Sequence, residues 1–297
     1  MNIIKTKNYP KSIFKYCHLK TPYGFDNLVK NQIYLSNPLG FNDPYDCSVT
    51  FNAEKIHTIM ANINIKTILD KFPEEELSIV DKNKILSNDN PKEKLLEIIN
   101  NKITTPEGIV KQEYINNQLR PQINNKLIDT FNEIYKDKLR VSSFSEGNNS
   151  LLMWSHYADC HKGFCTEYDI ESISEDENLK KYLFPIEYTE SIYDITQFYI
   201  DNIINNNPLN VNTLIKSVLY KSKEWEYENE WRFVITTSEY SRGFVKIPKP
   251  KAIYLGSKIY IKHKEQFIKL CQTNNILLFQ MKLDNKYFKM ISEPIKL

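Results

Sequence analysis

The stretch KSKEWEYENEWRFVI, residues 221–235, constrains the local fold more than any other part of the sequence. Its glutamates occupy alternate positions, namely Glu224, Glu226, Glu228 and Glu230. If the stretch were a single strand, its two-residue period would place all four carboxylates on one face, where like charges repel. A helix that ends near Asn229 and leads into the strand WRFVI avoids this repulsion. The pattern therefore predicts a helix-to-strand junction beside Glu228 and Glu230.

The predicted helix would place Lys221, Trp225 and Glu228 on one face, because they are spaced at i, i+4 and i+7. Glu228 and Glu230, two carboxylates in an E-x-E motif flanked by aromatic residues, are therefore candidate functional residues. The alternative is an exposed helix end whose acids are solvated, since charge runs usually mark solvent-facing surfaces. The sequence leaves both interpretations open.

The composition indicates a globular protein without a strong overall charge. Hydrophobic residues make up 41% of the 297 residues, which is enough for a core. Lys+Arg number 39 against 37 Asp+Glu, so no overall signal for nucleic acid or an anionic membrane is present. With no apolar leader and no run of 18 apolar residues, we expect a cytoplasmic protein without a membrane partner.

The numbers of cysteines and glycines further limit the classes of protein that fit this sequence. The five cysteines form no C-x-x-C pair, and we expect reduced thiols, mostly buried. Glycine occurs only 7 times, and no glycine-rich phosphate loop of the P-loop or Rossmann type is present. Two common nucleotide-binding designs are thereby excluded.

The order of patterns predicts an α+β fold: a mixed or mostly antiparallel sheet with flanking helices and a helical insertion. Residues 52–137 carry apolar residues at helical spacing, with Pro91, Pro106 and Pro121 as starts or breaks. Short apolar runs typical of strands flank this segment, with IYLS before it and LRVSSFS and AIYLG after it. We expect one domain over residues 1–297, built from about 1–51 and 138–297, with 52–137 inserted.

Two further blocks combine polar groups with aromatic residues. The first is LSNPLGFNDPYD, where turn chemistry alone accounts for Asn42 and Asp43. The second covers residues 141–165, where a predicted strand carries three serines and a predicted helix carries aromatic residues and a histidine. The candidate residues of this block are Ser143, Ser145, Trp154, His156 and Tyr157.

The histidines of the second block do not form a strong metal or triad signal. His156, Asp159 and His161 have a passable ligand spacing, but H-E-x-x-H and paired cysteines are missing, so no metal is predicted. A Ser/His/acid triad built on Ser143 or Ser145 with His156 lacks the G-x-S-x-G elbow, and a Cys160 nucleophile is weaker still.

Together, FNDPYD, SFSEGNNSLLMWSHYADCHKGFC and K-x-x-x-W-x-x-E-x-E-W-R followed by AIYLG resemble an uncharacterised bacterial family, domain of unknown function 2971. The blocks lie in matching order and cover both ends of the chain, whereas 52–137 matches nothing in particular. This resemblance implies an accessory protein of bacteria and mobile elements, with phage defence as one setting. It implies no reaction.

The order of three short motifs is also similar to that of ADP-ribosyltransferases of the bacterial-toxin type. FKYCH at 14–18, Ser143-Phe144-Ser145 and Glu228-Asn229-Glu230 follow that order, with Lys15 where the toxins have arginine. The resemblance implies NAD as substrate and a transition state resembling an oxocarbenium ion, which an ionised carboxylate stabilises.

The same resemblance implies a role for each candidate residue. Glu230 would be the stabilising carboxylate, and Glu228 would orient or activate the acceptor. Ser143 or Ser145 would position the sugar or the second glutamate. The predicted NAD-binding residues are Lys15 toward a phosphate, Tyr16 or Trp154 against nicotinamide, and His156 and Tyr157. The acceptor, whether a small molecule or a protein, is left open, as is the choice between transfer and hydrolysis.

Two alternatives belong to different functional classes. The first is a non-enzymatic recognition module that binds a protein or small ligand in an aromatic-lined cleft. The second is a nuclease-like effector that uses Asp43, Asp46 and His156 around a divalent metal. An NAD-using enzyme requires serine and a basic group to converge with Glu230 on one pocket, and a recognition module does not.

Overall fold

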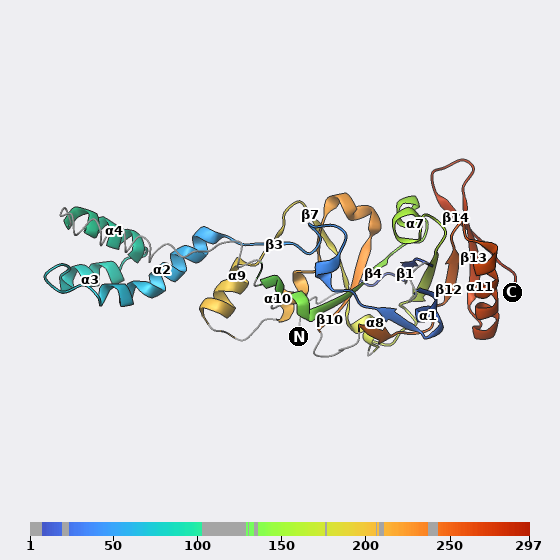
Figure 1. Ribbon diagram of the computed structural model, residues 1–297, viewed down its shortest axis with the longest axis horizontal. Helices are drawn as coiled ribbons and strands as arrows, with labels where there is room; N and C mark the ends of the chain where they lie inside the picture. Colours follow the sequence, from blue (N-terminus) through green and yellow to red (C-terminus); the bar gives the residue numbers. More distant parts are fainter. Residues whose placement is uncertain are drawn as a thin grey trace. The chain divides into compact units, whose positions relative to one another are not determined.

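The structure is a computed structural model, and it describes residues 8–19, 24–102, 129, 131–133, 136–175, 177–205, 207, 211–236 and 243–297 (Figure 1). Contacts divide the chain into two compact units. The first comprises Met1–Ser48, Asn132–Ile192 and Leu214–Leu297, and the second comprises Val49–Phe131 and Tyr193–Thr213. The expectation of a single domain with an insertion over 52–137 stays a prediction.

The first unit is built on an eight-stranded sheet in the order β14-β13-β12-β5-β1-β4-β10-β6. Its strands are β1 (Ser12–Cys17), β4 (Leu139–Ser145), β5 (Phe164–Asp169), β6 (Leu183–Pro185), β10 (Glu230–Thr236), β12 (Ala252–Leu255), β13 (Leu277–Leu283) and β14 (Met290–Pro294). Neighbouring strands are antiparallel except β12 and β13, whose parallel pairing requires the crossover helix α11 (Ile261–Asn274). The predicted α+β class with a mixed, mostly antiparallel sheet is confirmed.

Side-chain alternation gives β4 and β10 two different faces. Phe144, Trp231 and Phe233 lie in the main hydrophobic core together with Ile13 and Tyr168. On the opposite face, Arg232 is paired in register with Ser143, and Glu230 with Ser145. The two-residue period of WRFVI therefore buries the aromatic residues on one side and gathers charges and hydroxyls on the other.

The sheet opens between its two central strands. Strand β4 pairs with β10 over seven registered pairs, and β1 pairs with β5 over six, whereas β1 and β4 share only Phe14 with Ser145. Lys15 bridges the diverging strands, because its Nζ donates to Ser142 Oγ at 2.7 Å and to the Ser143 carbonyl at 3.2 Å. This opening is where the cavity described below lies.

Short helices surround the opening in the first unit. Helix α7 (Leu151–Tyr157) begins at Ser150, whose hydroxyl accepts a hydrogen bond from the Met153 amide at 3.3 Å. The 3₁₀ helix η4 (Lys223–Glu228) ends at Asn229, which adopts a left-handed conformation with φ 43°. The predicted junction between a helix and the strand that begins at Glu230 is confirmed.

The remaining elements of the first unit are short. They are α1 (Gly24–Val29), β2 (Gln32–Tyr34) paired with β11 (Phe244–Lys246), β7 (Glu187–Thr189) paired with β9 (Tyr220–Ser222), α8 (Asn178–Lys181), η1 (Pro38–Gly40) and η2 (Lys136–Lys138). Helix α11 buries Phe267 and Cys271 against Ile253 and Leu255 of β12.

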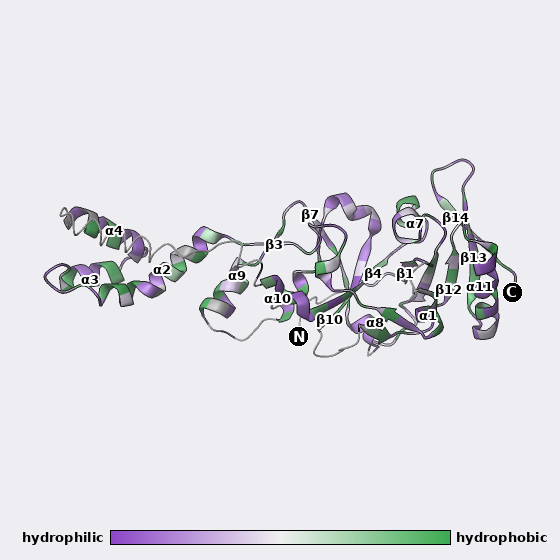
Figure 2. Cartoon of the chain, viewed as in Figure 1, coloured by the Kyte–Doolittle hydropathy of each residue, from purple (hydrophilic) through white to green (hydrophobic). Residues whose placement is uncertain are grey.

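The second unit contains the helices predicted for part of 52–137. They are α2 (Ala53–Leu69), α3 (Ile79–Leu86) and α4 (Pro91–Lys102), which carry both hydrophilic and hydrophobic residues (Figure 2). Their core includes Ile65, Leu69, Ile85 and Leu95. Pro91 begins α4 as predicted, while Pro106 and Pro121 lie outside the described residues.

Further short elements complete the second unit. Strand β3 (Val49–Thr50) pairs in parallel with β8 (Tyr193–Asp194), and α9 (Thr196–Tyr199) is followed by the π-helix η3 (Ile200–Ile204). Helix α10 (Val211–Lys216) begins in this unit and ends in the first.

The cysteines agree with the expectation of unpaired thiols. All five are free, with Cys47, Cys165 and Cys271 buried and Cys160 exposed. Across the described ranges, no helix combines the length and the apolar character needed to cross a membrane.

Candidate functional site

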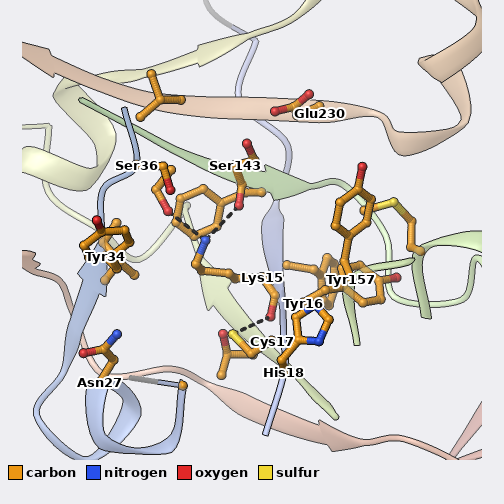
Figure 3. A pocket seen from close by; sticks show the side chains of 18 of the residues that line it. Lys15, Tyr16, Cys17, His18, Asn27, Tyr34, Ser36, Ser143, Tyr157 and Glu230 are labelled. Carbon is orange, nitrogen blue, oxygen red and sulfur yellow. Dashed lines mark hydrogen bonds between the residues drawn. The ribbon is translucent and has the colours of Figure 1, made fainter. Parts of the chain in front are cut away.

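A cavity of about 480 Å³ lies at the opening between β1 and β4, within the first unit. Its size falls within the range of small-molecule and cofactor sites, roughly 300–1,000 Å³. The predicted site residues in its wall are Lys15, Tyr16, Ser143, Tyr157, Glu228 and Glu230 (Figure 3). Segments far apart in the sequence therefore meet at this cavity.

Glu230 is a buried carboxylate with two cationic partners. Only 4% of the residue is exposed. Arg232 Nε donates to Glu230 Oε1 at 2.7 Å, and Lys221 Nζ donates to Oε2 at 2.9 Å. The Ser143 side chain points toward Glu230 from the neighbouring strand (Figure 3).

The pKa of Glu230 reflects this surrounding. Burial opposes the charged form, but Arg232 and Lys221 outweigh it, and with a hydrogen bond from Ser143 they lower the pKa to about 2. The carboxylate is therefore ionised at neutral pH, as stabilisation of a cationic transition state requires.

Glu228 has a different environment two residues away. Its Oε1 accepts a hydrogen bond from the Tyr157 hydroxyl at 2.7 Å, and its Oε2 accepts from Lys221 Nζ at 2.5 Å. Burial raises the pKa of this carboxyl, and Lys221 offsets the effect only in part. Two neighbouring carboxyls with pKa values shifted in opposite directions are typical of sites that divide ionised and proton-carrying roles.

Lys221 connects the two carboxylates. It lies in β9, directly before η4, and its Nζ is also 5.1 Å from the centre of the Trp225 ring. Burial lowers its pKa, but Glu230 and Glu228 outweigh burial and raise it overall, so the ammonium stays charged. The predicted grouping of Lys221, Trp225 and Glu228 occurs, although Lys221 belongs to a strand and not to the helix.

Ser145 acts on the backbone of the junction. Its hydroxyl donates to the Glu228 carbonyl at 2.7 Å, and the Glu146 amide donates to the Asn229 carbonyl at 3.1 Å. Ser145 is buried and does not line the cavity. The two serines of S-x-S therefore have different positions, with Ser143 beside the Glu230 carboxylate and Ser145 fixing the junction.

Three aromatic side chains hold the loop between β4 and α7. The Tyr16 hydroxyl donates to the Gly147 carbonyl at 2.9 Å, Trp154 Nε1 donates to the Asn148 carbonyl at 2.6 Å, and Trp231 Nε1 donates to Glu146 Oε1 at 2.6 Å. Tyr16 packs edge-on against Trp154, with ring centroids 5.3 Å apart.

These contacts separate the two residues predicted to stack on nicotinamide. Tyr16 lines the cavity, whereas Trp154 is completely buried and lies outside its wall. His156 is exposed on α7 and also lies outside the cavity wall. Tyr157 is the member of this helix whose polar group reaches a carboxylate.

Lys15 is the cation on the β1 side of the cavity. Burial lowers its pKa, and Cys17 and Glu230 oppose this shift. Its ammonium contacts the hydroxyl of Ser142 and a carbonyl, and it lies 5.1 Å from the centre of the Phe144 ring. A lysine with neutral partners at a cavity wall is suited to an anionic group of a ligand.

Three residues of the site were not among the predicted site residues. They are Lys221, Arg232 and Tyr188, whose hydroxyl accepts a hydrogen bond from the Glu230 amide at 2.7 Å. Alternation along WRFVI could have assigned Arg232 to the face of Glu230, since they are two positions apart. Tyr188 carries no comparable signal, because the pairing of β7 with β9 brings it there.

Asp46 is engaged in the same cluster. Both of its oxygens accept hydrogen bonds from Arg232 Nη2, at 2.9 and 2.7 Å. Within the described residues, no group of three or more His, Cys, Asp or Glu side chains is arranged to hold a metal ion. The metal-free site and the nuclease alternative both stay predictions.

The family comparison matches this part of the chain. Residues 153–233 match the family described as Protein of unknown function (DUF2971). The chain carries a DUF2971 segment. The resemblance expected from the sequence is confirmed over these residues, and the DUF2971 segment includes Tyr157, Lys221, Glu228 and Glu230. No curated protein and no solved structure matches the chain.

Proposed function

We propose that this protein uses NAD as a substrate and cleaves its nicotinamide–ribose bond, either as an ADP-ribosyltransferase or as an NAD glycohydrolase. The observation that carries the proposal is the convergence of Glu230, Ser143 and Lys15 on one cavity. They are an ionised carboxylate, a hydroxyl and a cation. The roles in phage defence and in the cytoplasm stay predictions.

The chemistry follows from the charge on Glu230. The C1′–N bond breaks, the electron pair leaves with nicotinamide, and positive charge develops on the ribose. An ionised carboxylate beside the ribose stabilises this charge, as carboxylates do in glycosidic cleavage. The hydroxyl of water or of an acceptor then attacks C1′, and its proton leaves to a base. Glu228 is suited to take this proton because its pKa is raised.

Positions around the cavity suit the other parts of the substrate. Ser143, beside Glu230, is suited to the ribose, and Lys15 to the anionic diphosphate. The Tyr16 ring, in the cavity wall, is suited to contact nicotinamide.

One observation favours a second function, a non-enzymatic recognition module. Glu230 and Glu228 are both bound by buried cations or hydroxyls, and this arrangement also suits a rigid binding wall. The cavity would then recognise a small ligand that carries hydroxyl groups, and no bond would be broken.

Nicotinamide release by the purified protein separates the two functions. The native chain is incubated with NAD, with and without cell lysate as a source of acceptor and activator, beside Glu230→Gln. We expect release by the native chain and a loss of at least about 100-fold in the variant, the scale of removing one stabilising group from a transition state. Absence of release from the native chain under both conditions would reject the enzyme and favour the recognition module.

A further inference from the structure

The loop from Asn37 to Ser48 supplies part of the cavity wall. Its residues at the wall belong to no strand or α-helix. Phe41, Asn42 and Asp46 of this loop line the cavity. Its internal hydrogen bonds are short-range, such as Asp46 N to the Asp43 carbonyl and Ser48 N to the Tyr45 carbonyl. Its place at the cavity therefore depends on side-chain contacts with the sheet.

Arg232 makes several of those contacts, from a position with 0% exposure. One end of its guanidinium binds Glu230, through Nε at 2.7 Å and Nη2 at 3.0 Å. Nη2 also binds both oxygens of Asp46, and Nη1 donates to Cys47 Sγ at 3.0 Å and to the Val218 carbonyl at 2.8 Å. Every nitrogen of the planar fork is thereby engaged.

Two further contacts connect the same loop to the same guanidinium. The Phe41 ring lies with its centre 5.2 Å from Arg232 Cζ. Cys47 has a left-handed backbone with φ 61° and is buried, although this conformation is unfavourable for a residue other than glycine. The contacts of Asp46 and Cys47 with Arg232 accompany this unfavourable conformation.

The charges around Asp46 explain why it is bound so fully. Its side chain is only 6% exposed, and Lys221 Nζ lies 3.7 Å from Oδ2. Lys136, another buried cation, interacts electrostatically with Asp46 and Cys47. A buried carboxylate in this position is stabilised by charge pairing, and its removal leaves cations without compensation.

We infer that Asp46 is a positioning residue: through Arg232 it holds the Phe41–Cys47 segment as a wall of the cavity and fixes the orientation of the Glu230 carboxylate. The same guanidinium binds both carboxylates. A substitution of Asp46 therefore alters the position of Arg232 and, through it, the orientation of the Glu230 carboxylate. Its consequence for turnover rests on the proposed function, whereas its consequence for the loop does not.

Alkylation of Cys47 tests this inference without any substrate. The full chain is treated with iodoacetamide, and the modified fraction of each cysteine is followed by peptide mass spectrometry. In the native protein we expect Cys47 to react as slowly as Cys165, since both thiols are buried and burial raises the pKa of the Cys47 thiol to about 12.

We expect Asp46→Asn to increase the alkylation rate of Cys47 by about tenfold or more, because the loop opens locally more often. Since Asp46 also raises the pKa of the Cys47 thiol, hydrogen–deuterium exchange of the Ser48 amide should rise in the same variant, which a lower thiol pKa alone would not cause. Cys165 should keep its native rate in the same sample. Asp137→Asn is the matched control, because this exposed carboxylate accepts a hydrogen bond from Asn37 at the start of the loop and does not contact Arg232. It should leave the Cys47 rate at the native value.

An unchanged Cys47 rate in Asp46→Asn would overturn the inference. So would an equal rise at Cys47 and Cys165, since that would indicate general unfolding and not opening of the loop.

Turnover gives the second measurement. If the native chain releases nicotinamide, Asp46→Asn should lower kcat, because the Glu230 carboxylate is oriented less well, and Asp46→Glu, which restores a carboxylate for Arg232, should recover part of the lost rate. A native chain without turnover would reject the proposed function and leave the alkylation result as the test of the loop.

Discussion

Two buried carboxylate sites on the same sheet differ in their surroundings. Glu167 on β5 is 8% exposed, and it accepts hydrogen bonds from Ser12 Oγ at 2.8 Å and from the Tyr254 hydroxyl at 2.6 Å. Glu230 on β10 is 4% exposed and is bound by two buried cations. Glu230 lines the cavity, and Glu167 does not.

The comparison shows that burial and hydrogen bonding of a carboxylate also occur away from the cavity, at Glu167. Glu167 has hydroxyl partners, and its nearest cation, Lys251, is 3.5 Å away and 40% exposed. Glu230 combines buried cations, a strongly lowered pKa and a neighbour, Glu228, whose pKa is raised. Glu230 and Glu228 both lie in the wall of the cavity.

Replacement of Arg232 should have the largest effect on stability. Arg232→Met leaves Glu230 and Asp46 buried with weaker compensation, from Lys221 and, for Asp46, also from Lys136, and we expect a loss of about 3–5 kcal/mol in the free energy of unfolding. Urea unfolding followed by tryptophan fluorescence measures it, since Trp154, Trp225 and Trp231 all lie in the first unit.

Arg140→Met is the matched control for this change. Arg140 on β4 donates to the carbonyls of Asp137 and Leu139 and binds no carboxylate among the described residues, so its loss should cost about 1 kcal/mol or less. Equal losses in the two variants would show that the buried cluster has no special role in stability.

Acidification should distinguish the two glutamates of the junction. The folded-state pKa of Glu230 is about 2 against an ordinary value of 4.5, so its contribution to stability is present above pH 4.5 and is lost as the pH falls toward 2. Glu228 has a raised pKa, so its contribution is present below pH 4.5 and is lost as the pH rises through the raised value.

The free energy of unfolding, measured across this pH range, checks both signs. Glu230→Gln should make the loss of stability on acidification shallower than in the native chain, and Glu228→Gln should make it steeper. Parallel curves for all three proteins would contradict the assigned pKa directions.

A change at Glu167 should affect stability and leave turnover unchanged. Glu167→Gln weakens the hydrogen bonds from Ser12 and Tyr254, and we expect a cost of about 1–2 kcal/mol. Because Glu167 lies outside the cavity wall, nicotinamide release should stay at the native rate. A decrease in release at equal folded concentration would remove the distinction between the two carboxylate sites.

The smallest effect is expected at an exposed ion pair. Glu190 Oε1 lies 2.9 Å from Lys223 Nζ, and both side chains are more than half exposed. Solvent screens such a pair, so Glu190→Gln should change the free energy of unfolding by about 0.5 kcal/mol or less. A larger loss would mean that an exposed ion pair on this chain contributes as much as buried hydrogen bonds do.

The sequence was informative where local rules determine structure. Alternating glutamates predicted a junction, and Asn229 ends the helix in a left-handed conformation before β10 begins. Apolar patterning predicted the strands LRVSSFS and AIYLG and a helix within 141–165, and the structure has β4, β12 and α7 there. The grouping of Lys221 with Glu228 also followed from their spacing.

Contacts between residues far apart in the chain could not be predicted from the sequence in the same way. The divergence of β1 from β4, which opens the cavity, depends on a register between strands more than 120 residues apart. Asp46 reaches Arg232 across 186 positions, and no local pattern specifies this contact. Trp154 shows that sequence neighbours can mislead. It stands beside polar residues in the sequence and was predicted to contact a ligand, but it is completely buried in the fold.

Nicotinamide release by Glu230→Gln and Glu167→Gln, compared at equal folded concentration, tests the functional assignment most directly. Both variants exchange one buried carboxylate for an amide of the same size. We predict native turnover for Glu167→Gln and a loss of at least about 100-fold for Glu230→Gln. Equal turnover in the two variants would contradict the assignment of the cavity carboxylate as the functional one.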